Sequence, residues 1–196
     1  MQLRRGRDEL VADLEWYGAA LIPNLLSGEE LDAYTRAARA LEYTDRSGLY
    51  GKRGVRQSMA SAEVTSGTGL YQLAVEIEEA VRSTFAEGDF ATRLAFNSRK
   101  VQRYPAGSVG IDPHLDESTN RSLIVLFGLS GLGLFTTYAE LEGPVRKQYM
   151  FAANSLVLLR APGFLGSNQR PLHGISQIRG GDDGYRYVLA MRQTGR

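Results

Sequence analysis

The sequence predicts an α+β fold in which a β-sandwich or jelly roll is supported by helices from the N-terminal half. Apolar residues recur at helical spacing in three stretches of the first half. After about residue 93 the pattern changes to short apolar or alternating runs between glycine and proline turns, which is typical of strands. The 196 residues show no repeat or linker, and a chain of this length buries a sizeable core as one domain.

Capping signals support the helices of the first half. Ser27 and Glu30 have the spacing of a capping box, with a serine at the N-cap and a glutamate three residues later. Gly18 and Gly88 are the expected stops of the first and third helices. We therefore expect helices over residues 7–17, 27–41 and 70–85, and a short strand over residues 19–22.

The second half supplies the predicted β core. Residues 93–196 are the expected jelly-roll core, and residues 1–92 the expected helical support and lid, of a single domain spanning 1–196. The strands that we expect cover residues 101–104, 123–129, 132–138, 148–151, 155–159, 174–178 and 185–193.

Between the second and third helices, residues 44–69 lose any periodic pattern and become rich in small and basic residues. Loops this long in a compact domain are usually functional covers or disordered segments. On composition alone the segment is a solvated loop. If it closes over a site, its guanidinium groups and tyrosines favour an anionic or aromatic substrate. The candidate substrate residues in it are Tyr50, Lys52, Arg53 and Arg56, with Arg46 beside them.

Composition excludes several classes of site and protein. The chain has no cysteine, so a metal site must use nitrogen and oxygen ligands. The net charge of +1 is too small to indicate nucleic-acid binding. No apolar run approaches the roughly 20 residues that cross a bilayer, and the basic N-terminus lacks the apolar core of a signal peptide. We therefore expect a cytoplasmic protein without membrane contact.

A histidine and an aspartate two positions apart, His114 and Asp116, form the first candidate metal site. On a strand they would share a face and could bind one ion together. The chain has only two histidines, so His173 is the candidate third ligand. Two imidazoles and one carboxylate leave open positions on a metal, as in non-haem Fe(II) oxygenases. Singly, these residues suit an ordinary turn and a buried histidine, but all three lie beside strands of one predicted β unit.

The last predicted strand, residues 185–193, adds a candidate anion site. Arg186 and Arg192 fall on the face of Val188 and Ala190, because they are an even number of residues apart. Buried guanidinium groups are costly unless paired, and this strand contains no acidic residue. A bound carboxylate would solve the problem; alternatively, Arg192 belongs to a solvated basic C-terminus. The residues expected on the opposite face are Tyr187, Leu189 and Met191.

Four motifs in order carry a family resemblance. They are Gln102-Arg103-Tyr104-Pro105-Ala106-Gly107, His114-Leu115-Asp116, His173-Gly174-Ile175 and Arg186-Tyr187-Val188-Leu189-Ala190-Met191-Arg192-Gln193. Over residues 100–193 the chain resembles the Fe(II)- and 2-oxoglutarate-dependent dioxygenases. Within them it is most similar to the branch that contains the AlkB-type nucleic-acid repair enzymes.

The resemblance implies a double-stranded β-helix (jelly roll) and a requirement for Fe(II), 2-oxoglutarate and O2. The iron ligands that it implies are His114, Asp116 and His173. By the same resemblance Arg186 holds the distal carboxylate of 2-oxoglutarate. Arg192, Gln102 and Tyr104 lie near the carboxylate next to the keto group.

We therefore expect a dioxygenase that hydroxylates or otherwise oxidises a small organic molecule and releases succinate and CO2. A first alternative is AlkB-like oxidative demethylation of nucleobases. AlkB-type members carry asparagine at the position of Gln102 and polar residues at those of Val188 and Ala190, so a nucleic-acid substrate is not favoured. A second alternative is a jelly-roll module that binds a small anion without catalysis.

Overall fold

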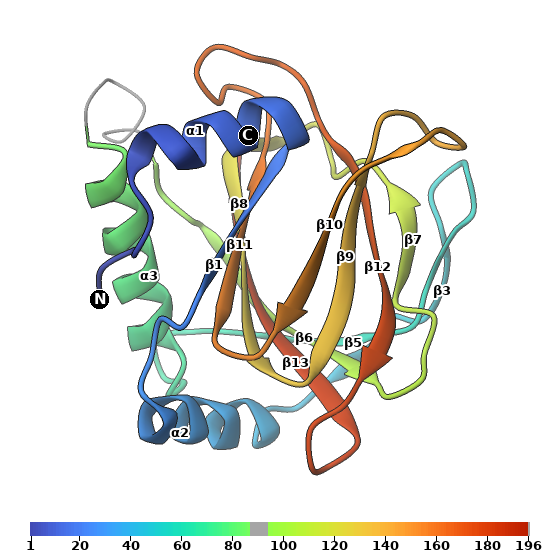
Figure 1. Cartoon of the computed structure of the whole chain (residues 1–196). Coiled ribbons are helices and arrows are strands. Elements are labelled where there is room, and N and C mark those ends of the chain that lie inside the picture. Colours follow the sequence, from blue (N-terminus) through green and yellow to red (C-terminus); the bar gives the residue numbers. More distant parts are fainter. Residues whose placement is uncertain (87–93, 196) are drawn as a thin grey trace.

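The computed structural model describes residues 1–86 and 94–195, and Figure 1 shows its arrangement of helices and strands. The helices in these residues are α1 (Arg7–Tyr17), α2 (Gly28–Arg39) and α3 (Tyr71–Thr84). The strands of the first half are β1 (Ala19–Pro23), β2 (Thr44–Asp45), β3 (Gly48–Tyr50), β4 (Val55–Gln57) and β5 (Ala60–Glu63). Those of the second half are β6 (Ser98–Pro105), β7 (Ile111–His114), β8 (Asn120–Ser130), β9 (Leu132–Tyr138), β10 (Val145–Ala152), β11 (Ser155–Arg160), β12 (Leu172–Arg179) and β13 (Tyr185–Thr194).

These strands form two antiparallel sheets. The larger sheet has the order β1-β11-β8-β13-β6-β5-β2, and the smaller has the order β10-β9-β12-β7-β4-β3. Several neighbouring strands are far apart in sequence, as the position of β13 between β8 and β6 illustrates. The predicted α+β fold with a jelly-roll core is confirmed.

Two apolar cores lie on opposite faces of the larger sheet. Alternate residues of its strands, such as Val125 in β8 and Leu189 in β13, pack with the three helices in one core. Their neighbours, such as Ile124 and Val188, belong to a second core that includes Phe135 and Phe151 of the smaller sheet. The helices therefore cover the outer face of the larger sheet (Figure 1), and the second core lies between the sheets.

The predicted helices agree with α1, α2 and α3. Gly18 ends α1 in the left-handed conformation, with φ of 78°, and its N–H donates to the Leu14 carbonyl. Both hydrogen bonds of the capping box between Ser27 and Glu30 are present at the start of α2. Gly88, the expected stop of the third helix, lies outside the described residues, as does the expected boundary between residues 92 and 93.

The prediction of one long loop over residues 44–69 is wrong over much of that segment. Within residues 44–63 the chain forms β2 and β5, which extend the larger sheet beside β6, and the hairpin β3–β4, which extends the smaller sheet beside β7. These strands have only two to four residues. Such short strands gain their order from the sheet edges that they join, so no periodic pattern marks them in the sequence.

Asn154, in the turn between β10 and β11, connects this turn to the start of α2. Its side-chain oxygen accepts hydrogen bonds from the N–H groups of Leu25 and Leu26, and its amide donates to the Leu26 carbonyl. We expect Asn154→Ala to lower the free energy of unfolding by about 2 kcal/mol more than Asn24→Ala does. Both asparagines have φ near +60°, so the difference isolates the side-chain hydrogen bonds. Urea denaturation measures it, and equal losses would contradict the assigned role.

None of the helices in residues 1–86 and 94–195 is long and apolar enough to span a membrane.

Candidate metal and anion site

Two strands of the smaller sheet bring the histidines together. His114 is the last residue of β7, and His173, near the start of β12, lies directly opposite it in the antiparallel pair. Their ring centroids are 4.4 Å apart. Asp116 does not share a strand with His114, because β7 ends at His114. The chain nevertheless returns Asp116 to the site, and ligand atoms of the three side chains all lie within 4.8 Å of one another.

Glycines permit this close approach of β7 and β12. A Cβ atom on Gly174 would lie 2.9 Å from the Ile111 carbonyl oxygen, and one on Gly110 would overlap the backbone of Ile175. Gly110 also has a φ of 74°, a conformation that side chains disfavour. The pairing of the two histidines therefore requires glycine at both positions, Gly174 after His173 and Gly110 before β7.

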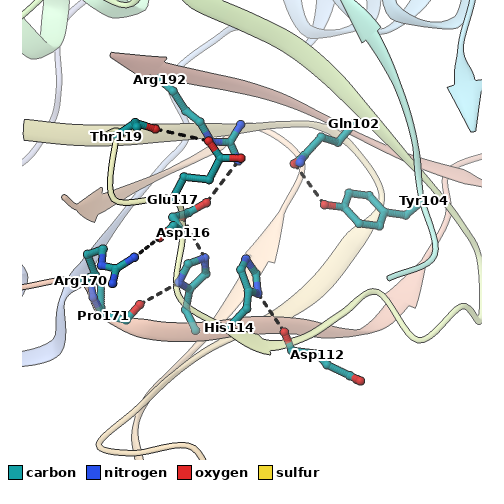
Figure 2. A network of polar contacts seen from close by, with 11 residues as sticks. Gln102, Tyr104, Asp112, His114, Asp116, Glu117, Thr119, Arg170, Pro171 and Arg192 are labelled. Atoms are coloured by element: carbon teal, nitrogen blue, oxygen red, sulfur yellow. Dashed lines mark hydrogen bonds and ion pairs between the residues drawn. The ribbon is translucent and has the colours of Figure 1, made fainter. Parts of the chain in front are cut away.

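Backbone carbonyls orient both imidazoles (Figure 2). Nδ1 of His114 lies 2.9 Å from the carbonyl oxygen of Asp112, and Nδ1 of His173 lies 3.0 Å from that of Pro171. A carbonyl only accepts hydrogen bonds, so each Nδ1 carries the proton. The lone pair of each ring is thus on Nε2, as in many metal-binding histidines.

The surroundings of His173 and Asp116 shift their pKa values toward the protonation states that bind a cation. Burial lowers the pKa of His173 to about 4, although the charge of Asp116 acts in the opposite direction. Burial would raise the pKa of Asp116, but interaction with His173, Arg192, His114 and Arg170 outweighs burial and lowers the pKa. A neutral imidazole and an ionised carboxylate are the forms that bind metals. Within the described chain, the buried Asp116 Oδ2 accepts no hydrogen bond.

The lowered pKa of His173 makes the metal-free fold sensitive to acid. Between pH 6.5 and about pH 4 the unfolded chain binds a proton that the folded chain excludes, so acidification favours unfolding. We expect this group to lower the free energy of unfolding by roughly 3 kcal/mol across that range. Urea denaturation at several pH values measures the effect. His173→Gln should reduce the slope, and an unchanged slope would contradict the prediction.

The three ligands line one side of a pocket between the sheets. We call it the inner pocket, and residues of both sheets form its wall. Aromatic and aliphatic side chains form much of its wall. Among them, Phe135 stacks on His173 with ring centroids 5.5 Å apart. The other lining residues are Gln102, Tyr104, Ile111, Ile124, Leu126, Phe151, Gly174, Ile175, Arg186, Val188 and Arg192.

Arg186 is a buried cation in this wall. Its side chain is 0% exposed, and its Nη2 donates to the Phe151 carbonyl at 3.2 Å. Nε and Nη1 have no hydrogen-bond partner among the described residues, and no described carboxylate forms an ion pair with the group. Burial lowers the pKa of Arg186 to about 10, against the opposing effect of Tyr104. A bound anion would satisfy both free nitrogens and offset the desolvation of the charge.

The remaining polar residues lie between Arg186 and the metal ligands. The Tyr104 hydroxyl donates to Gln102 Oε1 at 3.1 Å (Figure 2), which leaves the Gln102 amide as a donor. Burial raises the pKa of Tyr104 to about 12, so the phenol stays protonated. Arg192 Nη2 lies 3.7 Å from Asp116 Oδ1. The alternation predicted for the last strand is observed, since Arg186, Val188 and Arg192 line the inner pocket while Tyr187, Leu189 and Met191 pack under the helices.

Comparison with known proteins identifies the fold. No protein-family model and no curated protein sequence matches the chain. A prolyl hydroxylase from Trichoplax adhaerens, solved with a hypoxia inducible factor peptide fragment, superimposes with a TM-score of 0.67 at 15% identity over 96% of this chain and 88% of that one. A 2OG-Fe(II) oxygenase family oxidoreductase from Burkholderia pseudomallei gives 0.64 at 17% identity over 100% and 94%. HygX from Streptomyces hygroscopicus, with nickel, 2-oxoglutarate and hygromycin B bound, gives 0.63 at 13% identity over 95% and 86%. The chain has the 2OG-Fe(II) oxygenase fold.

The donor set of this oxygenase fold fits a divalent iron ion. His114 and His173 offer oriented Nε2 atoms, and Asp116 offers a buried oxygen without a hydrogen bond in the described chain. Two imidazoles and one carboxylate on one side of an ion suit Fe(II) and leave positions open. The three described ligands and the unpaired guanidinium share one pocket.

The lid residues expected from the sequence lie outside the inner pocket. Tyr50, Lys52 and Arg53 belong to the β3–β4 hairpin and line a separate hollow that has His114 in its wall. Arg56 instead forms an ion pair with Asp112 at 3.4 Å. The hairpin therefore flanks the candidate site and does not line the inner pocket.

Sequence reasoning missed several residues of this candidate site. Phe135 and Phe151 lie on strands that were predicted, but their alternation did not indicate which face lines a pocket. Arg170 donates to the Asp116 backbone carbonyl at 2.9 Å and so stabilises the segment beyond β7. The sequence signal that could have identified Arg170 was its position three residues before His173, a candidate metal ligand.

Proposed function

We propose that the protein is an Fe(II)- and 2-oxoglutarate-dependent oxygenase acting on a small organic substrate. One observation carries the proposal: a buried guanidinium without an acidic partner in the described chain faces the same pocket as the His114, Asp116 and His173 cluster. An iron site alone would not explain why Arg186 is buried without an anionic partner in the described chain. A dicarboxylate that reaches from the metal to Arg186 accounts for both features.

The chain's own residues bind and orient the reactants. We assign the iron to His114, Asp116 and His173, and the distal carboxylate of 2-oxoglutarate to the free Nε and Nη1 of Arg186. Iron(II) with 2-oxoglutarate and O2 supplies the oxidising chemistry, with succinate and CO2 as co-products. The aromatic wall of the inner pocket excludes water, which strengthens each of these electrostatic contacts.

Gln102, Tyr104 and Arg192 are assigned to the carboxylate next to the keto group. The hydrogen bond from Tyr104 holds the Gln102 side chain so that its amide protons can face the ligand. Arg192 adds positive charge beside Asp116. All the residues that line the inner pocket fall within 93–196, which supports the proposal of one oxygenase domain over 1–196 with its chemistry in the second half.

Absorption spectroscopy and product analysis test this function. Anaerobic protein with Fe(II) and 2-oxoglutarate should show a metal-to-ligand charge-transfer band, and admission of O2 should release succinate. A jelly-roll module that only binds an anion would give neither signal. Absence of both the band and succinate would refute the oxygenase proposal.

The finer resemblance to the AlkB-type branch rests on the sequence of the last strand. Nucleic-acid binding needs many phosphate contacts, and a net charge of +1 offers weak support for them. We therefore propose a small molecule, by analogy with the hygromycin B bound to HygX. Tight binding of single-stranded DNA or RNA at low salt would favour nucleobase demethylation instead.

A further inference from the structure

Two hollows meet outside the inner pocket, on the side of His114. Arg53, Leu115, Leu141 and Arg170 line both of them. Figure 1 shows the β3–β4 hairpin beside the turn that follows β9, and these two segments contribute Arg53 and Leu141. We call the joined hollows the outer cleft. Because His114 and Leu115 belong to its wall, a molecule bound there is adjacent to the metal ligands.

The outer cleft has an excess of positive charge. Four arginines and one acidic residue, Glu140, line the hollow farther from His114. The nearer hollow shares two of these arginines and adds Lys52, Asp112 and Glu142, of which Asp112 pairs with Arg56. None of the four arginines forms an ion pair with a carboxylate in the described part of the chain. Like charges gathered around a hollow repel one another, and a bound anion relieves this repulsion. The four arginines are Arg53, Arg146, Arg160 and Arg170.

Arg160 gives independent support for an anion, because it is buried. It is 6% exposed, and its Nε has no hydrogen-bond partner among the described residues. Its other nitrogens contact neutral oxygens only, the Gln169 side chain at 2.8 Å and the Glu15 carbonyl at 3.3 Å. Burial and the nearby charge of Arg146 lower the pKa of Arg160. A desolvated guanidinium of this kind favours a carboxylate or phosphate ligand.

The border of the outer cleft is also apolar. Leu115 and Leu141 are 40% and 46% exposed, although leucine usually avoids water. Both leucines line the two hollows, so they offer apolar surface to a ligand bound there. Arginines and leucines therefore line the same cleft, a combination that matches a molecule with an apolar body and a charged end.

We propose that the substrate is an organic anion, with its apolar body against Leu115 and Leu141 and its carboxylate or phosphate group among the arginines of the outer cleft. This inference rests on the oxygenase function, because it places the substrate next to the iron ligands. It adds the class of substrate and the residues that select it. The inner pocket remains available for 2-oxoglutarate.

Calorimetric titration with defined probes tests the substrate class. The protein is loaded with Ni(II) and 2-oxoglutarate, so that Arg186 is occupied, and titrated with 4-phenylbutyrate, phenyl phosphate and the neutral 4-phenylbutanamide. We expect at least one anion to bind about tenfold or more tightly than the amide, and the tighter anion distinguishes carboxylate from phosphate recognition. Acetate, which lacks the apolar body, should bind weakly. Equal affinity for the anions and the amide would overturn the proposal.

Matched variants locate the binding site. Arg53→Gln should weaken binding of the tighter anion at least fivefold and leave the amide unchanged. Leu141→Ser should weaken both probes. Arg36→Gln, the same charge change on the exposed face of α2, is the control and should have no effect. Equal anion affinity in R53Q and R36Q would overturn the assignment.

The same experiment separates the two proposals. Failure of 2-oxoglutarate to bind the Ni(II)-loaded protein counts against the oxygenase function. The difference between R53Q and R36Q is measured with and without 2-oxoglutarate, so it reports on the outer cleft in either case. Bound 2-oxoglutarate without any preference for anions would overturn only the substrate class.

Discussion

Replacement of Asp116 by alanine is expected to lower the affinity for Fe(II) or Ni(II) by about 100-fold or more and to abolish succinate release. Even residues that only support a metal ligand contribute 10- to 100-fold to affinity, and Asp116 supplies the single carboxylate of the cluster. Its loss leaves two neutral imidazoles beside the positive charge of Arg192. Calorimetry with Ni(II) and the anaerobic charge-transfer band measure the result.

Asp112→Ala is the matched control for this variant. Asp112 lies four residues earlier, and its half-exposed carboxylate pairs with Arg56. Only its backbone carbonyl contacts His114, and alanine retains that group. We expect wild-type metal affinity for D112A, and a similar affinity in both variants would show that Asp116 is not a ligand.

Replacement of Arg186 by methionine is expected to weaken 2-oxoglutarate binding roughly 100-fold without destabilising the metal-free fold. A hydrogen bond to a charged group contributes about 1.5 to 3 kcal/mol, and Arg186 has two free nitrogens to offer. Methionine fills much of the same volume and removes a buried charge that lacks an acidic partner in the described chain. Exchanges of that kind are often neutral or stabilising.

Titration of 2-oxoglutarate into Ni(II)-loaded protein and urea denaturation measure the two effects of R186M. Arg186→Lys keeps the charge but loses the planar fork that binds both oxygens of a carboxylate. We expect R186K to bind 2-oxoglutarate with intermediate affinity. Unchanged cosubstrate affinity in R186M would remove the proposed role of Arg186, and a large loss of stability would show that the arginine is structural.

The sequence predicted best those features that depend on local periodicity. The alternation of residues along the last strand correctly separated Arg186 and Val188 from Tyr187 and Leu189, because a two-residue period is imposed by the backbone itself. The capping box of α2 was predicted for a similar reason, since both of its hydrogen bonds connect residues three apart.

Features that depend on distant partners were not predictable. The short strands within residues 44–63 pair with β6 and β7, and nothing in their own composition indicates those edges. The arginines of the outer cleft come from four separate segments, and their common hollow appears only in the folded chain. Asp116 was chosen because a strand would place it on the face of His114, whereas β7 ends at His114 and the segment after it brings the carboxylate to the histidines.

The two cores on opposite faces of the larger sheet have a consequence for insertions and deletions. In β13 the residues that face the helices and those that face the inner pocket are immediate neighbours. A shift of β13 by one residue along β6 and β8 would reverse the direction of every side chain. The phenol of Tyr187 would then enter the pocket, and the guanidinium of Arg186 would be forced among apolar helix residues. Changes of chain length in the turn before β13 should therefore be tolerated only where the turn absorbs them without a shift of the strand.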